Sequence, residues 1–340
     1  MNRRFVHLCV CFLFASAPLQ ADDHQALTRY TFTEPHMGTE FKIILYATDQ
    51  AAAGKASKAA FQRVADLDHI MSDYQATSEL SRLCQKAGGD PVRVNDDLFF
   101  VLSKAEEVSK LSDGAFDVTV GPVVKLWRLS FRTQKMPDKE KLTKALALVG
   151  YQKVHLDAKA KTVKLDKPGM QLDLGGIAKG YAADEALAVL HKNGIDRALV
   201  AASGDIAVSG PPPDAAGWTV AIAPLDSTKD KPEKSVVLRD AAVSTSGDAE
   251  KYVEIDGKRY SHIVDPHTGL GLTQRMSATV IARRGITADS MTKILCVLGP
   301  QKGMPIIDKS RGLAAYMVRK TEKGVESIAS AEFKKRYEND

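Results

Sequence analysis

Residues that could take part in chemistry gather in five short stretches of the chain. The first, Asp173–Gly180, has glycines at 175, 176 and 180 where a helical pattern begins. Free backbone N–H groups at a helix N-terminus favour bound anions. The stretch has neither the Gly-Lys-Ser/Thr of a P-loop nor the spacing Gly-x-Gly-x-x-Gly. An anion site and a tight turn packed on a neighbour therefore both remain open.

Two stretches of small residues, Ala202–Asp205 and Ser244–Asp248, each include a Gly-Asp pair. Glycine and aspartate are typical of turns at strand ends, so a structural interpretation as turns suffices. Their hydroxyl and backbone N–H groups could also contact a phosphate group. Taken alone, these residues favour the structural interpretation.

The stretch Ser261–Gly269 (SHIVDPHTG) places two histidines, an aspartate and hydroxyls around one predicted strand end. A histidine beside Asp265 could be oriented as a general base. A purely structural histidine explains the pattern equally well.

The stretch Thr287–Lys293 (TADSMTK) begins a predicted helix with oxygen-bearing side chains. An aspartate with a nearby hydroxyl is what Mg²⁺ prefers when it keeps waters and binds a substrate phosphate. Thr287 acting as a helix N-cap, with Asp289 in the first turn, accounts for the same residues.

The elements that must position these stretches alternate between helical and strand patterns. Apolar residues at helical spacing predict a helix through residues 60–71, a helix capped by Asn95 through 108, and a short helix at 138–149. Helical patterns also follow Gly180 and cover 288–297 and 301–308. Strand patterns cover 40–46, 153–156, 162–165, 198–202, 206–208, 219–223, 236–238, 252–255, 260–264 and 314–318. This order predicts an α+β fold with mixed or antiparallel sheets and helices packed against them.

The N-terminus has the layout of a secretory signal peptide. Two arginines precede an apolar run at 5–15, and small residues end at Ala21. We expect residues 1–21 to be removed and 22–340 to form a single domain. We then expect the mature chain to be exported to the periplasm, without stable insertion in a membrane. It retains Cys84 and Cys296, which we expect to be free thiols.

The charge balance excludes the strongly basic character that is typical of proteins that bind nucleic acid. Lysine and arginine number 47 against 42 aspartates and glutamates, a net charge of +5 that falls to +3 once Arg3 and Arg4 leave with the signal peptide.

The chain resembles the ApbE family of FAD:protein FMN transferases. The resemblance rests on seven segments that occur in order, at 36–41, 71–83, 114–127, 172–186, 244–252, 259–269 and 286–299. It implies a two-lobed α+β fold with FAD in the cleft. The implied reaction moves FMN from FAD onto a threonine or serine of an acceptor protein and releases AMP. The implied partner is the flavin-accepting subunit of an exported or membrane redox complex.

The resemblance also assigns site residues. The positions implied to contact FAD are Met37, Tyr74 (its ring on the isoalloxazine), Ala115, Phe116, Asp117, Asp173, Lys179 and Ile263. His262 is our hypothesis for the base that accepts the hydroxyl proton. Asp289 is also assigned a catalytic role, because the resemblance implies that it binds a Mg²⁺ ion. Ser203 stands where the family often has a second glycine.

The implied Mg²⁺ site uses main-chain carbonyls at Gly176 and near Ile286, the Asp289 carboxylate and a threonine four residues later. Here that position is Lys293, and the hydroxyl lies one residue earlier, at Thr292. One residue turns a helical side chain by about 100°. A protonated lysine cannot ligate a metal, but Lys293 could contact phosphate directly and replace part of the cation's charge.

Three alternative functions share parts of this pattern. A Mg²⁺-dependent FAD pyrophosphatase would use the same site with water as the nucleophile. A non-catalytic periplasmic FAD-binding protein would bind FAD and release no AMP. A periplasmic solute-binding module would leave all seven segments unexplained.

Overall fold

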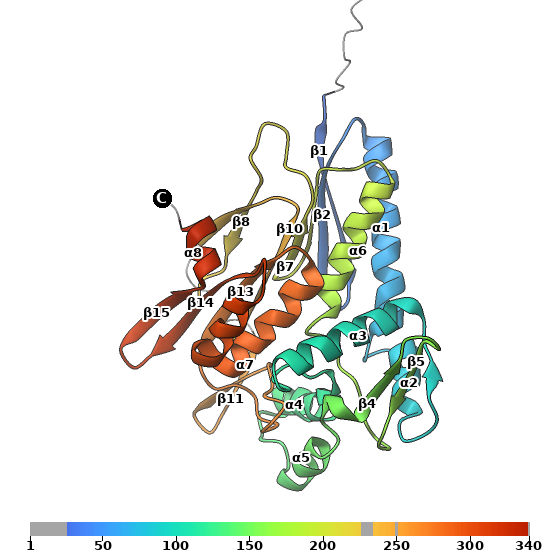
Figure 1. Cartoon of the computed structure of the whole chain (residues 1–340), viewed down its shortest axis with the longest axis vertical. Coiled ribbons are helices and arrows are strands. Elements are labelled where there is room, and N and C mark those ends of the chain that lie inside the picture. Colours follow the sequence, from blue (N-terminus) through green and yellow to red (C-terminus); the bar gives the residue numbers. More distant parts are fainter. Residues whose placement is uncertain (1–25, 226–233, 249–250, 339–340) are drawn as a thin grey trace, which may run out of the picture.

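The computed structural model describes residues 26–225, 234–248 and 251–338 (Figure 1). The predicted signal peptide lies outside these ranges, as does most of the charged segment 228–234, which the sequence pattern predicts to be a surface loop. The framework is an eight-stranded sheet in the order β1-β2-β6-β7-β10-β13-β14-β15, antiparallel at every pairing. Its strands are β1 (Thr28–His36), β2 (Thr39–Ala47), β6 (Ala198–Ala202), β7 (Asp205–Val208), β10 (Ala241–Gly247), β13 (Met276–Ala282), β14 (Ala314–Thr321) and β15 (Gly324–Ala329).

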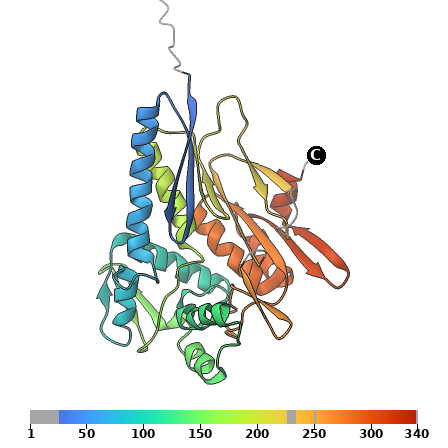
Figure 2. The ribbon, with the colours of Figure 1, turned by 180° about the vertical axis from the view of Figure 1, so that it is seen from behind.

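Three long helices pack against this sheet and form the largest core with it: α1 (Gln50–Met71), α6 (Ala178–Lys192) and α7 (Gly285–Lys309). Helix α1 begins at the N-cap Asp49, whose carboxylate accepts the Ala52 N–H at 2.8 Å. Its buried face carries the apolar residues on which that helix was predicted. Figure 2 shows α1 from behind, alongside the β1–β2 hairpin.

The hairpin of β8 (Trp218–Ile222) and β9 (Lys234–Leu238) contributes to a second core with α8 (Ala331–Tyr337). Large side chains such as Trp218, Tyr316 and Phe333 fill it, and the Tyr316 and Phe333 rings stack at 5.2 Å. The central sheet contributes apolar side chains to both cores, so inner strands such as β6 and β13 are buried on both faces.

The remaining elements gather at the lower end of the molecule in Figure 1. They are α2 (Glu79–Gln85), α3 (Asp96–Leu111), α4 (Gly121–Thr133), α5 (Lys139–Leu146), the strands β3 (Val92–Arg93), β4 (Val154–Asp157) and β5 (Thr162–Leu165), the hairpin β11 (Tyr252–Ile255) and β12 (Lys258–Ser261), and short 3₁₀ turns at Val118–Val120 and Tyr151–Lys153. A third core joins α4 to this hairpin through Trp127 and Tyr260. As predicted, Asn95 caps α3 by accepting the Leu98 N–H at 2.8 Å.

Several sequence-based predictions need correction. Ser244–Gly247 is the end of the central strand β10 and not a turn. Helix α7 begins at Gly285, so Thr287 lies within its first turn and is not the N-cap. The two helices predicted at 288–297 and 301–308 are the halves of α7, which bends where Gly299 adopts φ 67° before Pro300. Strands β1, β3 (Val92–Arg93), β13 and β15 and helices α2 (Glu79–Gln85), α4 and α8 were not predicted.

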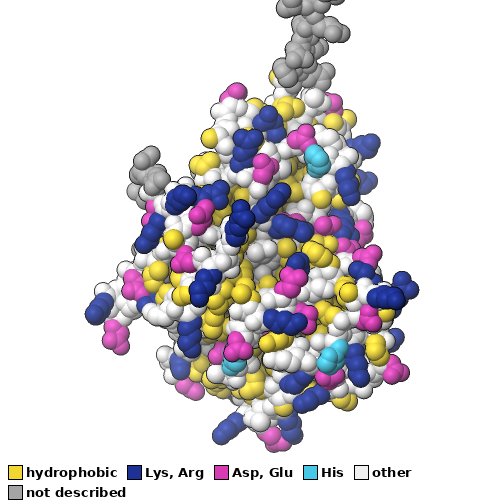
Figure 3. All heavy atoms as spheres, viewed as in Figure 1, with side chains coloured by type: hydrophobic (Ala, Val, Ile, Leu, Met, Phe, Trp, Pro, Cys, Tyr) yellow, Lys and Arg dark blue, Asp and Glu magenta, His cyan; other side chains and the backbone are white. Residues whose placement is uncertain are grey.

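Within the described ranges, no helix has the length and apolar character needed to cross a membrane. Cys84 and Cys296, the two cysteines among the described residues, are free thiols, as expected. On the face drawn in Figure 3, lysine and arginine side chains are interspersed with aspartate and glutamate.

Candidate active site

A cavity of about 1270 Å³ opens where the helices, the central sheet and the lower elements meet. It exceeds the usual volume of pockets for drug-sized ligands, about 300–1,000 Å³, and suits a dinucleotide. Most of the predicted site residues line it: Met37, Tyr74, Ala115, Phe116, Asp117, Asp173, Gly176, Lys179, His262 and Ile263. The predicted metal-site residues Ile286, Asp289 and Thr292 lie buried beneath its wall.

An arginine absent from the predicted site holds one side of the cavity. Arg128 on α4 pairs with Asp73 at 2.6 Å and with Asp173 at 2.9 Å. Its guanidinium also lies 4.1 Å from the ring centroid of Tyr74, a residue 78% exposed. Asp173 in turn accepts the Gly175 N–H at 2.8 Å, which fixes the glycine turn. Arg128 therefore links the predicted flavin-contacting tyrosine to that turn.

Helices α6 and α7 meet backbone to backbone beside this turn. A Cβ added at Gly180 would lie 2.2 Å from the Gly285 carbonyl oxygen, so the contact requires glycine. The Asp184 carboxylate accepts the Gly285 and Ile286 N–H groups at 2.6 and 3.1 Å, which anchors the start of α7 on α6. Burial raises the pKa of Asp184, and these two N–H groups oppose the rise.

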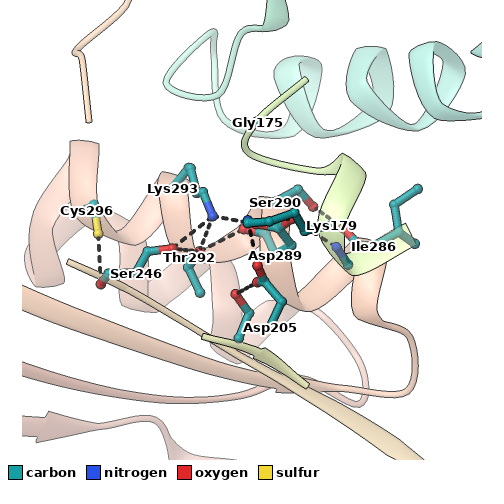
Figure 4. A network of polar contacts seen from close by, with 12 residues as sticks. Gly175, Lys179, Asp205, Ser246, Ile286, Asp289, Ser290, Thr292, Lys293 and Cys296 are labelled. Carbon is teal, nitrogen blue, oxygen red and sulfur yellow. Dashed lines mark hydrogen bonds and ion pairs between the residues drawn. The ribbon is translucent and has the colours of Figure 1, made fainter. Parts of the chain in front are cut away.

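This contact places Asp289 at the N-terminus of α6, where its Oδ2 accepts the Gly180 N–H at 3.1 Å. The glycine-turn segment therefore does hold an anion, and the anion is a side chain of the protein. Asp289 is fully buried and lies between the ammonium groups of two lysines (Figure 4). Lys179 Nζ lies 3.9 Å from its Oδ2, and Lys293 Nζ contacts its Oδ1.

The charged cluster continues to the sheet. Lys179 Nζ pairs with Asp205 Oδ2 at 2.6 Å, and Asp205 Oδ1 accepts the Ser244 hydroxyl at 2.5 Å. Burial alone would lower the pKa of Lys179, but the Asp289 and Asp205 carboxylates outweigh it and raise that pKa. Burial alone would raise the pKa of Asp289, and the two ammonium groups reverse this effect. Lys179 is therefore cationic at neutral pH.

The residues predicted to ligate Mg²⁺ do not fit that ion. Asp289 Oδ1 is occupied by the Lys293 ammonium, and the Thr292 hydroxyl donates to the Asp289 main-chain carbonyl at 2.7 Å. The Ile286 carbonyl accepts the Ser290 hydroxyl at 2.9 Å. Across the part of the chain that the structure describes, no three histidine, cysteine, aspartate or glutamate side chains form a metal-binding group. Figure 4 shows the lysine amine beside the carboxylate and hydroxyl oxygens.

His262 lies on the cavity wall at the end of β12. Because a carbonyl only accepts, the ring's Nδ1–H donates to the Lys251 carbonyl at 3.0 Å, which leaves the Nε2 lone pair free. Burial among the cavity walls, aided by the charges of Lys293, Lys251 and Lys179, lowers the pKa of His262 to about 4, against the opposing effect of that carbonyl. The ring is neutral at physiological pH although its edge is exposed to the cavity.

The sequence pattern suggested that Asp265 orients His262, but in the structure it does not. It pairs with His267, whose Nδ1 lies 3.2 Å from Asp265 Oδ1, and accepts the Thr268 hydroxyl at 3.1 Å. Ile263, the predicted flavin contact beside His262, is buried at the cavity wall.

Two other predicted contacts also have local structural roles. The Asp117 carboxylate accepts the Thr119 N–H at 2.8 Å and the Tyr151 N–H at 2.7 Å, so it fixes the turn that carries Phe116. Met37 occupies the two-residue turn between β1 and β2 with φ 49°, and its N–H donates to Asp68 at 3.2 Å.

Several residues of the site were not predicted, among them Arg128, Asp205 and Ser246. The last two lie in the small-residue stretches, where the hydroxyls and the Gly-Asp pair were the available signal. Nothing in the sequence around Arg128 marks it, because its partners are 45 and 55 residues away.

Comparisons with known proteins agree with this geometry. The model of the ApbE family matches residues 37–317. The FAD:protein FMN transferase of Vibrio cholerae is 32% identical over 94% of this chain and 96% of its own length, and that of Haemophilus influenzae is 34% identical over 79% and 80%.

Solved structures are similar too. The flavin transferase ApbE from Vibrio cholerae superposes with a TM-score of 0.83 at 30% identity, over 92% of this chain and all of that one. The apo flavinyl transferase ApbE of Pseudomonas stutzeri gives 0.81 at 29% identity, over 92% and 98%. With a family model matched over most of its length and such relatives matched nearly end to end, the chain belongs to the ApbE family.

Proposed function

We propose that this chain transfers the FMN moiety of FAD to a threonine or serine hydroxyl of an acceptor protein and releases AMP. The observation that carries the proposal is the convergence, in one dinucleotide-sized cavity, of two cationic lysines and a neutral histidine with a free Nε2. The names of the relatives, FAD:protein FMN transferase, support the same reaction.

The reaction breaks one P–O bond of the FAD pyrophosphate. The acceptor oxygen attacks the phosphorus on the FMN side, the bridging oxygen leaves with AMP, and the hydroxyl proton passes to a base. Negative charge on the phosphoryl oxygens must be stabilised throughout. Lys179 and Lys293, which both line the cavity, would supply that stabilisation, and His262 Nε2 would accept the proton. No step uses a metal, because the residues at the implied Mg²⁺ positions do not fit one.

The remaining predicted contacts would hold the flavin. The Tyr74 ring has the Arg128 guanidinium on one face, and its large exposed area leaves room for the isoalloxazine to stack on it. Met37 and Phe116 would add apolar contacts, while Asp117 and Asp173 would act mainly by fixing the turns around the ligand.

Location and acceptor complete the proposal. The arginine-led apolar pattern at 1–21 favours a cleaved leader, with residues 22–340 forming one exported domain. The acceptor would then be a flavin-carrying subunit of an exported or membrane redox complex. Both statements rest on the sequence pattern and on the family resemblance.

Intact-mass spectrometry of a threonine-containing acceptor domain tests the function. The domain is incubated with the full chain and FAD, and we expect a mass gain equal to one FMN. Free FMN and AMP without a labelled acceptor would instead indicate a pyrophosphatase. Bound FAD without AMP would indicate a binding protein.

The role of His262 has its own test. We expect His262→Ala to slow transfer by about 10²–10⁴-fold, the usual contribution of a general base. The matched control is His155→Ala on β4, a histidine paired with Asp166 at 2.8 Å and absent from the cavity lining. Equal rates for His262→Ala and the control would remove His262 from the mechanism.

A further inference from the structure

We infer that the Lys293 ammonium is a built-in cation of the pyrophosphate site, so that this chain needs no divalent metal at Asp289. The inference rests on the proposed function for its catalytic part. Its structural part, that Lys293 excludes a metal from Asp289, stands on the geometry alone.

The first observation is the set of atoms around Lys293 Nζ. The ammonium contacts the Asp289 carboxylate, the Ser246 hydroxyl at 2.8 Å and the Thr292 hydroxyl at 3.3 Å. One carboxylate and two hydroxyls are the oxygen ligands that a hard cation would seek. Here a covalently attached cation already holds them (Figure 4).

The hydroxyl protons around this ammonium can be assigned. Thr292 donates to the Asp289 carbonyl at 2.7 Å, so the 2.7 Å contact between Thr292 and Ser246 requires Ser246 to donate. Ser246 then receives the Lys293 N–H, and a directed chain runs from Lys293 through both hydroxyls to the carbonyl. The Thr292 hydroxyl therefore faces the backbone and its strand neighbour, and a metal ion would have to break the chain to reach it.

The lysine stem also fills the space that an ion would need. A Cβ added at Gly176 would lie 3.3 Å from Lys293 Cγ and 3.4 Å from its Cε, so the stem runs against the glycine turn. The implied ligands Gly176 and Asp289 thus have the lysine between them. An ion bound to Asp289 would meet two ammonium groups, those of Lys293 and Lys179, and both would repel it.

The ammonium remains positioned to act on a ligand. Lys293 lines the cavity, and its side chain is 18% exposed. Its weakest contact, 3.3 Å to Thr292, leaves one N–H that can turn toward a phosphate oxygen. Asp289 is fully buried behind it, so the carboxylate positions the lysine and does not face the substrate.

Mn²⁺ titration followed by electron paramagnetic resonance tests the structural part, using the chelator-treated full chain with and without FAD. We expect Lys293→Thr, which frees Asp289 and restores a hydroxyl four residues after it, to create a Mn²⁺ site. The wild type should bind Mn²⁺ at least about tenfold more weakly than this variant. Adding Asp289→Asn should abolish the new site, and Lys302→Met, an exposed lysine on the same helix, should behave as wild type. Stoichiometric Mn²⁺ binding by the wild type that Asp289→Asn removes would overturn the inference.

Transfer rates test the catalytic part. We expect the wild type to transfer FMN equally with chelator and with Mg²⁺, and Lys293→Met to lose about 10²–10³-fold in either condition, as when one electrostatic stabiliser is removed. Lys293→Thr should be slow in chelator and recover with Mg²⁺. Wild-type transfer that stops in chelator and returns with Mg²⁺ would refute the inference while leaving the proposed function intact. If no condition supports transfer, the proposed function fails, and the Mn²⁺ titration still decides whether Lys293 excludes the metal.

Discussion

The contact between α6 and α7 at Gly180 can be tested by adding a single methyl group. In Gly180→Ala the new Cβ would lie 2.2 Å from the Gly285 oxygen, 2.5 Å from its carbonyl carbon and 2.8 Å from the Asp289 Cβ. Two of these atoms are backbone, so no flexible side chain can move aside. The helices must separate by at least about 0.8 Å to bring the closest contact to 3.0 Å.

The size of the effect follows from two opposing terms. Overpacking a well-packed site costs about 1–3 kcal/mol, and a contact between backbones belongs at the upper end. Replacing glycine by alanine within a helix recovers about 1 kcal/mol of intrinsic propensity. The net free energy of unfolding should therefore fall by about 2 kcal/mol, which for a chain of this length lowers the melting temperature by about 3 °C.

Urea denaturation followed by circular dichroism measures this change, with Gly54→Ala as the matched control. Gly54 lies in α1, and apart from its chain neighbours and the backbone of its own helix no described atom comes within 4 Å of a Cβ placed there. This variant should therefore gain about 0.5–1 kcal/mol. Because Lys179 and Asp289 adjoin the contact, Gly180→Ala should also slow transfer by about 10²-fold. A Gly180→Ala protein as stable as the Gly54→Ala control would refute the close approach of the helices.

Three further predictions concern charge, pH and backbone strain. Asp289→Asn removes the carboxylate between Lys179 and Lys293, and breaking this buried pair should cost about 3–5 kcal/mol in urea unfolding; unchanged stability would contradict the pairing. His262 acts as a base only while neutral, and its pKa is about 4. Protonation of His262 should therefore not change the transfer rate between pH 8 and pH 5, and it should lower the rate as the pH drops through 4. A midpoint near the ordinary value of 6.5 would contradict this. Ser203 adopts φ 58° between β6 and β7, so Ser203→Gly should raise the thermal stability by about 1 kcal/mol, and a lower melting temperature would show that its side chain matters more than its strain.

Patterns within one element were sufficient to predict much of the fold. Helix α3 follows from its Asn95 cap and its apolar spacing, and the β11–β12 hairpin follows from Asp256-Gly257, which adopts φ values of 50° and 74°. Strand β10 was missed because Ser244–Gly247 has the composition of a turn, while its small side chains suit a central strand that α7 crosses closely. Local composition gives no sign of such a neighbour.

In the candidate site too, some features could be predicted from the sequence and others depend on tertiary contacts. The cavity gathers the predicted residues because the matched segments are specific, but the relations among their side chains depend on tertiary contacts. Asp265 lies only three residues after His262 in the sequence, yet its carboxylate pairs with His267. The sequence shows that Lys293 replaces a hydroxyl, and its contact with Asp289 follows from their spacing of four residues in α7. Its contact with Ser246, by contrast, follows from the approach of α7 to β10.

The strand order of the central sheet has a consequence for how the protein folds. Strand β2 pairs with β6 about 150 residues later, and the cavity draws its walls from residues as far apart as Met37 and Val297. Such non-local pairing slows folding, since long loops must close before the contacts that stabilise them can form. No fragment that ends before α7 contains the complete cavity. Occupancy by FAD therefore reports on the finished chain, and at about 100 times its dissociation constant the ligand would add about 2.7 kcal/mol to the stability of the native state.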